Sequence, residues 1–141
     1  MKVVFARLHF QGGLIIALGM KPRILFVDDE AATLEALALY FRDRGCEVAT
    51  AGTGSQAMKL ADEATFDLAV FDINLAGENG MELLGVFKTN FPELPVVLLT
   101  GLPENDELAE QALARGASGF MVKADSLENL FAALHCYLPA G

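Results

Sequence analysis

Basic residues are scarce in this chain of 141 residues, where ten lysines and arginines stand against nineteen aspartates and glutamates for a formal net charge of −9. Such a negative surface repels polyanions, so we expect no direct binding of nucleic acid. Internal repeats and low-complexity tracts are lacking as well. Apolar residues make up 53% of the chain, which is enough to bury a core and excludes intrinsic disorder.

Cysteine and histidine are equally scarce, with two residues of each type. Cys46 and Cys136 lie far apart in the sequence, so we expect two reduced thiols that serve in packing rather than a disulfide scaffold or a redox pair. His9 stands alone near the start of the chain and is a poor ligand candidate. The sequence therefore offers no cluster suited to zinc.

Long apolar runs are missing too. The apolar stretch 14–18 comes after the polar break at 11–13 and is far shorter than the roughly 20 residues that span a bilayer. We expect no membrane span and no export, and hence a cytoplasmic location. Met20 precedes the first strong strand, so residues 1–19 are interpreted as an N-terminal extension and residues 20–141 as one domain.

Short apolar runs alternate with segments whose apolar residues recur at helical spacing. The runs are 23–27, 47–51, 68–71, 95–99 and 119–122, and the helical segments are 34–41, 57–64, 83–87, 108–113 and 127–138. This alternation predicts an α/β fold, a doubly wound parallel sheet of five strands with five flanking helices. The more polar run 47–51 is expected at an edge of the sheet. Helix starts are predicted from three polar pairs, Thr53 with Gln56, Asn79 with Glu82, and Asp125 with Glu128.

Charged and polar residues follow four of the predicted strands. They are Asp28, Asp29 and Glu30 after the first, Asp72 after the third, Thr100 and Gly101 after the fourth, and Lys123 after the fifth. Ligands of such sheets gather outside the carboxyl ends of the strands, so these side chains should meet. Crowded carboxylates call for a cation, and a set of oxygen ligands suits Mg²⁺. A carboxylate, a hydroxyl and an ammonium around one pocket fit phosphoryl transfer to Asp72.

Four stretches of sequence carry a family resemblance. They are Ile24–Glu30, Asp67–Asn74, Val96–Gly101 and Gly116–Lys123, and together they resemble the receiver domains of two-component response regulators. The resemblance covers residues 21–138 and implies the strand order 2-1-3-4-5. Because residues 139–141 leave no room for a second domain, we expect a stand-alone receiver domain.

The resemblance also implies roles for individual residues. Asp72 would accept phosphate from a histidine kinase or a histidine phosphotransfer protein. Mg²⁺ would be bound by Asp29, Asp72 and the backbone carbonyl of Asn74, with Asp28 acting through water. Lys123 would bridge to the acyl phosphate, while Thr100 and Phe120 would form the switch that reshapes the surface of the fourth helix, fifth strand and fifth helix.

Three positions depart from the usual pattern or tune it. Ala124 follows Lys123 and Ala76 stands in the loop after Asp72, where the family commonly has proline. The stretch 77–80 is therefore expected to be a more flexible loop. Leu102 is apolar, so we expect it to hinder water and to slow the loss of phosphate.

Two other functions are weighed against this one. A protein-binding module of the pseudo-receiver type would keep the fold without using phosphate. A hydrolase with an aspartyl phosphate intermediate would need a second acid where Asn74 stands, so we expect no turnover enzyme. The output would pass to an unidentified downstream protein, with a homodimer as a second option, and Met121, Leu127 and Phe131 are candidates for that contact.

Overall fold

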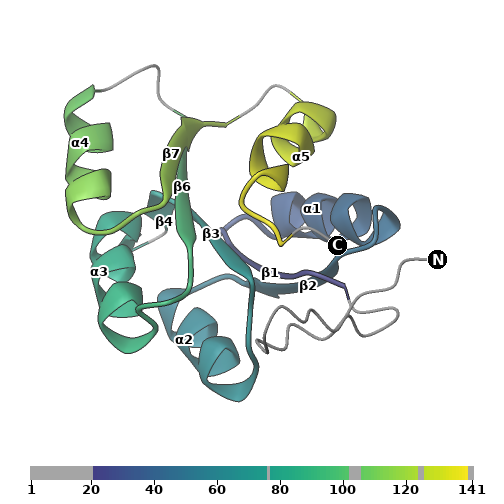
Figure 1. Cartoon of the computed structure of the whole chain (residues 1–141), viewed down its shortest axis with the longest axis horizontal. Coiled ribbons are helices and arrows are strands. Elements are labelled where there is room, and N and C mark those ends of the chain that lie inside the picture. The colour runs from purple at the N-terminus through teal and green to yellow at the C-terminus, as the bar shows by residue number, and fades with distance from the viewer. Residues whose placement is uncertain (1–20, 76, 102–105, 124–125, 140–141) are drawn as a thin grey trace, which may run out of the picture.

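The computed structural model describes residues 21–75, 77–101, 106–123 and 126–139. Its centre is a five-stranded parallel sheet in the order β2-β1-β3-β6-β7 (Figure 1). The strands are β1 Arg23–Val27, β2 Glu47–Ala51, β3 Leu68–Asp72, β6 Val96–Thr100 and β7 Gly119–Val122. Counted without the two short strands β4 and β5, this is the predicted order 2-1-3-4-5. The polar strand β2 lies at an edge, as predicted.

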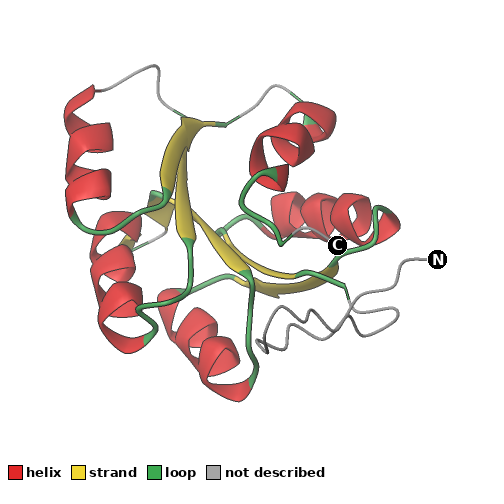
Figure 2. Cartoon of the chain, viewed as in Figure 1, coloured by secondary structure: helices red, strands yellow, loops and turns green. Residues whose placement is uncertain are grey.

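Five helices cover the two faces of the sheet, so the predicted α/β fold is confirmed (Figure 2). They are α1 Ala31–Asp43, α2 Gly54–Glu63, α3 Gly80–Asn90, α4 Asp106–Ala114 and α5 Leu127–His135. Helices α1 and α5 lie on one face, and α2, α3 and α4 lie on the other (Figure 1). Among the described residues, no helix is long and apolar enough to cross a membrane.

The core has two layers because successive residues of a strand point to opposite faces. In β1, Leu25 and Val27 join the layer under α2, α3 and α4, whereas Ile24 and Phe26 join the layer under α1 and α5. All four are fully buried or nearly so, as the unbroken apolar run predicts for a central strand.

Three helix starts test the predicted caps. Thr53 Oγ1 accepts a bond from Gln56 N, as expected for the cap of α2. The Gln56 side chain returns to the backbone as well, but its Oε1 accepts from Gly52 N rather than from Thr53 N. Asn79 Oδ1 accepts from Met81 N at the start of α3, as predicted. For α5 the prediction of Asp125 with Glu128 is wrong.

The cap of α5 is Ser126, whose Oγ accepts a bond of 3.0 Å from Asn129 N. Ser126 has the extended backbone of a cap, with φ −146° and ψ 155°, so its hydroxyl reaches the third amide of the helix. Asp125 itself lies outside the described residues.

The loop after β3 contains a short antiparallel ladder that the sequence did not predict. Strands β4 Asn74–Leu75 and β5 Glu78–Asn79 pair as Asn74 with Asn79 and Leu75 with Glu78. Leu75 is 5% exposed and anchors this hairpin in the core. The stretch expected to be a flexible loop is thus a defined hairpin, because a buried apolar side chain and backbone pairing hold it.

Other sequence predictions meet the structure unevenly. Both cysteines are free, but only Cys46 is buried, so the packing role predicted for the exposed Cys136 is wrong. Leu102, Ala76 and Ala124 lie outside the described residues, as does the extension 1–19 with His9. Their predictions, and the domain boundary at residue 20, stay predictions.

Candidate functional site

The carboxyl ends of four parallel strands bring the predicted chemical groups to one edge of the sheet. Strand pairing places Val27 beside Phe71, Asp72 beside Leu99, and Thr100 beside Val122. Asp28 and Lys123 follow directly after β1 and β7. Residues separated by as many as 95 positions in the chain are therefore neighbours, which confirms the predicted convergence.

Three carboxylates form the centre of this site. Asp28, Asp29 and Asp72 each offer an oxygen atom, and these oxygens all lie within 4.8 Å of one another. Asp28 and Asp72 are only 5% and 6% exposed, whereas Asp29 is open to solvent. Like charges this close repel strongly unless a cation or protons compensate them. A cluster of carboxylate oxygens with one open side fits a hard divalent ion such as Mg²⁺.

Lys123 supplies one positive charge to the cluster. Its Nζ donates a hydrogen bond of 2.8 Å to Asp72 Oδ2 and lies 3.6 Å from Asp28 Oδ2. Burial by itself would lower the pKa of this ammonium, but the bonds and charges of Asp72 and Asp28 outweigh it and raise the pKa above the ordinary 10.5. Lys123 is therefore cationic, and its ammonium group is held by the carboxylate of Asp72.

Asp28 differs from Lys123, because its shifted pKa disfavours the charged form of the side chain. Burial raises its pKa above the ordinary 3.8, and the neighbouring charges of Asp72 and Asp29 add to this. The Glu30 amide, which donates a bond of 2.9 Å to Asp28 Oδ1, and the charge of Lys123 oppose the rise without cancelling it. One lysine faces three carboxylates here, so negative charge is in excess at this edge.

The backbone around Asp72 is held tightly. Asn74 N donates a bond of 3.0 Å to Asp72 Oδ1, and Gly80 N donates one of 2.9 Å to Ile73 O. A Cβ on Gly80 would lie 2.6 Å from the carbonyl oxygen of Asp72 and 2.7 Å from Ile73 Cα. Only glycine allows the start of α3 to pack this closely against the residue that carries the central carboxylate.

The predicted switch residues lie on neighbouring strands. Thr100 ends β6 with no exposed surface, and its carbonyl accepts a bond of 2.6 Å from Lys123 N. Phe120, on β7, pairs with Leu98 and packs half-buried against the core layer under α2, α3 and α4. The structure thus joins Thr100 to Lys123 through the backbone and places Phe120 three residues upstream of that lysine.

One residue at this edge was missed by sequence reasoning. Both carboxylate oxygens of Glu78 accept from Gly54 N, at 3.1 and 3.0 Å, which ties the hairpin to the first residue of α2. The partners are 24 positions apart, so no local spacing could have revealed the contact.

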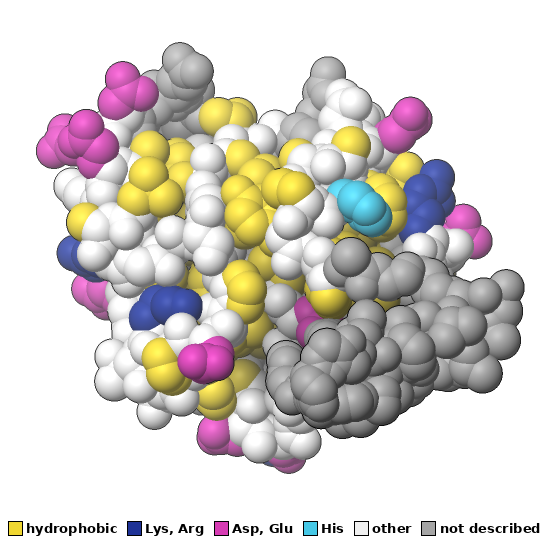
Figure 3. Space-filling view, viewed as in Figure 1, with side chains coloured by type: hydrophobic (Ala, Val, Ile, Leu, Met, Phe, Trp, Pro, Cys, Tyr) yellow, Lys and Arg dark blue, Asp and Glu magenta, His cyan; other side chains and the backbone are white. Residues whose placement is uncertain are grey.

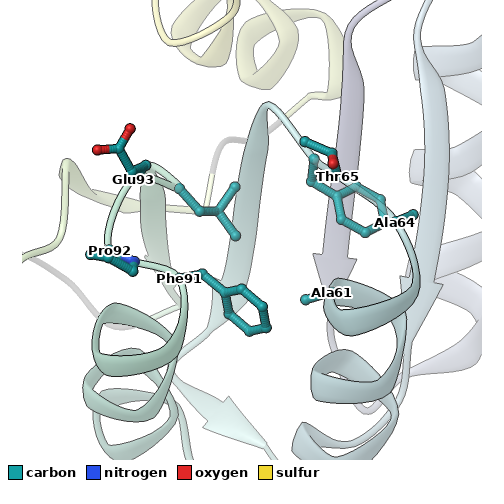
Figure 4. Close-up of a pocket in the computed structure, with 8 residues that line it drawn as sticks. Ala61, Ala64, Thr65, Phe91, Pro92 and Glu93 are labelled. Atoms are coloured by element: carbon teal, nitrogen blue, oxygen red, sulfur yellow. The ribbon is translucent and has the colours of Figure 1, made fainter.

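A hollow in the surface lies at the opposite edge of the sheet, where the amino ends of the strands meet. It has a volume of about 260 Å³ and is lined by Ala61, Ala64, Thr65, Phe66, Phe91, Pro92, Glu93 and Leu94. In Figure 4 the ring of Phe91 faces Ala61 across this space, and the carboxylate of Glu93 points away from it. These walls are apolar, so the hollow has no set of groups for phosphoryl or metal chemistry.

Comparison with known proteins agrees with this geometry. Residues 24–135 match the family described as the response regulator receiver domain. The alginate biosynthesis transcriptional regulatory protein AlgB of Pseudomonas putida is 36% identical over 108 residues, which are 77% of this chain and 24% of AlgB. The chain therefore spans about a quarter of the length of this curated relative.

Solved structures give the same answer. The chemotaxis response regulator CheY4 of Vibrio cholerae is 28% identical with a TM-score of 0.77, covering 84% of this chain and 100% of that one. The response regulator TrrA of Thermotoga maritima, solved in complex with Mg²⁺ and BeF, is 28% identical with a TM-score of 0.73 over the same shares. With four sequence motifs and the acidic edge in place, this chain belongs to the response regulator receiver domains of two-component systems.

Proposed function

We propose that this receiver domain is a phosphoacceptor, and that Asp72 takes a phosphoryl group from a phosphohistidine of a histidine kinase or a histidine phosphotransfer protein. The observation that carries the proposal is the buried Asp72 carboxylate, 2.8 Å from Lys123 Nζ and clustered with two further aspartates. A structural aspartate needs no such surroundings. The residues match what a carboxylate nucleophile requires.

The transfer follows from the groups at this edge. An oxygen of the ionised Asp72 carboxylate attacks phosphorus, the P–N bond of the phosphohistidine breaks, and the imidazole leaves with the electron pair and takes up a proton from solvent. No general base is needed, because the nucleophile is already ionised. Lys123, whose Nζ bonds to Asp72, would pair with an oxygen of the transferred group, and the buried Thr100 would turn its hydroxyl inward to donate a hydrogen bond to it.

The acidic set also indicates which residues would hold the metal. We assign Asp29, Asp72 and the Asn74 carbonyl as ligands of Mg²⁺, with Asp28 contributing through water. When bound, Mg²⁺ supplies positive charge for the oxygens of the transferring phosphoryl group. Asp28 and Asp29 add the negative charge that favours a divalent ion at this position, since oxygens of both lie within 4.8 Å of one another and of an Asp72 oxygen.

The output would leave through the α4, β7 and α5 surface. Apolar side chains are visible between α4 and α5 in Figure 3, and β7 there carries Val122 with 42% exposure. Once Thr100 turns toward the phosphoryl group, the Phe120 ring follows and this surface changes for a downstream protein, with a homodimer as the second option. Met121, Leu127 and Phe131 pack partly against the core, so they can transmit the change. The chain would act in the cytoplasm, without binding nucleic acid directly and without catalytic turnover.

Incubation with acetyl phosphate and Mg²⁺, followed by intact mass, tests the proposal. We expect the gain of one phosphoryl group, its loss on alkaline treatment as befits an acyl phosphate, and no gain when EDTA replaces Mg²⁺. A folded protein that gains no mass would instead be a protein-binding module of the pseudo-receiver type. Steady release of inorganic phosphate over many turnovers would favour the hydrolase.

A further inference from the structure

The hairpin that carries Asn74 is tied to α2 by one side chain. Both Glu78 carboxylate oxygens lie 3.0–3.1 Å from Gly54 N, and this amide is the first of α2. The opening amides of a helix have no partner inside the helix and carry partial positive charge, so a carboxylate is a favourable partner there. Gly54 itself is buried, so its amide has little other access to solvent.

The contact matters because of what surrounds the hairpin. On the side of α3 and α4, Asn74, Glu78 and Asn79 line a hollow of about 330 Å³ rather than packed side chains. Leu75 sets the depth of the hairpin in the core. The Glu78 contact with Gly54 is the described side-chain bond that holds the hairpin against α2.

We propose that Glu78 is a positioning residue for metal binding: by clamping the β4–β5 hairpin to α2, it fixes the backbone of Asn74 next to Asp72. Strand pairing connects the two points, since Glu78 pairs with Leu75 and Asn79 pairs with Asn74. The Asn74 amide in turn bonds to Asp72 Oδ1. This inference rests on the proposed function, because it assumes that the Asn74 carbonyl is a Mg²⁺ ligand.

Two substitutions break the clamp from opposite sides. Glu78→Ala removes the carboxylate. Gly54→Ala keeps the amide and the charge, but its Cβ would lie 2.5 Å from Glu78 Oε1 and so pushes the carboxylate away. The nearest other atom, Leu83 Cδ1 at 3.1 Å, is the end of a flexible side chain and can yield.

Mg²⁺ affinity without a phosphodonor is the main measurement, followed by amide shifts in NMR titrations. We expect Glu78→Ala and Gly54→Ala each to weaken Mg²⁺ binding by roughly tenfold, the lower end for groups that orient metal ligands. The double variant should be no weaker than either single variant, because both act on one contact. Glu78→Gln keeps the reach and one acceptor oxygen, so it should restore most of the affinity.

The matched control is Glu82→Ala, which removes the same charge from an exposed position in the first turn of α3. Equal weakening in this control would overturn the clamp in favour of a general charge effect. A purely structural cap would lower the melting temperature of Glu78→Ala and leave Mg²⁺ affinity unchanged, which would also overturn the proposal.

Hydrogen exchange of the Gly54 amide, measured in EDTA, reports on the clamp directly. Protection in the wild type and its loss in Glu78→Ala are expected, and fast exchange in the wild type would refute the contact. Normal Mg²⁺ binding in every variant would sink this inference and leave the phosphoacceptor proposal standing. Absence of Mg²⁺ binding in the wild type would instead overturn the proposed function, and the inference with it.

Discussion

The two edges of the sheet differ in how their polar groups are paired. At the amino edge, polar groups serve the fold: Asp67 Oδ2 accepts a bond of 2.7 Å from Arg23 N, and the Lys88 ammonium donates to the carbonyls of Pro92 and Leu94. At the carboxyl edge, Asp28 and Asp72 are buried with a single lysine between them. At the amino edge these polar groups bond to the neighbouring backbone, whereas the carboxyl edge leaves negative charge in excess.

This difference separates stability from chemistry. Burying like charges costs free energy, and a protein keeps such an arrangement where a ligand will use it. The amino edge has an apolar hollow of about 260 Å³ and bonds that close loops, so substitutions there should affect folding alone. Substitutions of the crowded carboxylates at the carboxyl edge should weaken binding or phosphorylation without destabilising the fold.

The largest expected effect comes from one exchange made at each edge. Asp72→Asn removes the proposed nucleophile, so we expect phosphorylation by acetyl phosphate to disappear from intact-mass spectra. Asp67→Asn makes the same chemical change at the amino edge and should leave phosphorylation intact, while it lowers the free energy of unfolding by about 1 kcal/mol through a weaker bond to Arg23 N. Phosphorylation of Asp72→Asn at the wild-type level would break the comparison.

A core substitution measures what the fold itself contributes. Phe87 has no exposed surface. The centroid of its ring lies 4.8 Å from the ring centroid of Phe71 and 5.4 Å from that of Phe91. Phe87→Ala should lower the free energy of urea unfolding by about 3–5 kcal/mol, because it leaves a cavity in the core. Val86→Ala, on the exposed side of the same helix, is the control and should change stability by less than about 1 kcal/mol.

Asp28→Asn should move stability and metal binding in opposite directions. Without Mg²⁺ the variant should melt at a higher temperature than the wild type, because a buried carboxylate that repels Asp72 is gone. Its Mg²⁺ affinity should fall by roughly tenfold or more, since the carboxylate proposed to act on the metal through water has been neutralised. Lower stability of the variant in EDTA would show that the crowded carboxylates do not strain the fold.

The difference in stability between Asp28→Asn and the wild type should depend on pH. This is the smallest of the expected effects, and it tests whether the buried charge of Asp28 is the cause of the difference. The raised pKa of Asp28 means that the folded state binds more protons than the unfolded state, so the stability of the wild type falls as pH rises from 3.8 through the raised value. The advantage of Asp28→Asn in EDTA should therefore grow across this range and then level off.

Lys123 contributes in a different window. Its raised pKa stabilises the fold fully below 10.5, and this contribution is lost only as pH rises through the raised value. Urea unfolding between pH 4 and 8 therefore reports on Asp28 without interference from the lysine. A flat difference between Asp28→Asn and the wild type over this range would contradict the assignment.

Periodicity was sufficient to predict the sheet, because the buried strands are apolar on both faces and β2 is not. The site followed from topology, since parallel strands bring Asp28, Asp72, Thr100 and Lys123 to one edge. Local signals failed where two residues compete for one role, as Ser126 did with Asp125 at the start of α5. They also failed for the Glu78 contact, where tertiary packing alone joins the partners.

Gly80 brings the start of α3 into direct contact with the backbone of Asp72. The start of α3 packs directly on the main chain of Asp72 and Ile73, with no side chain between them. A shift of this backbone would therefore move the start of α3 with it. Helix α3 would register events at Asp72 mechanically, by a route separate from Thr100 and Phe120. With Asp72 phosphorylated as proposed, α3 would be a second surface affected, besides that of α4, β7 and α5.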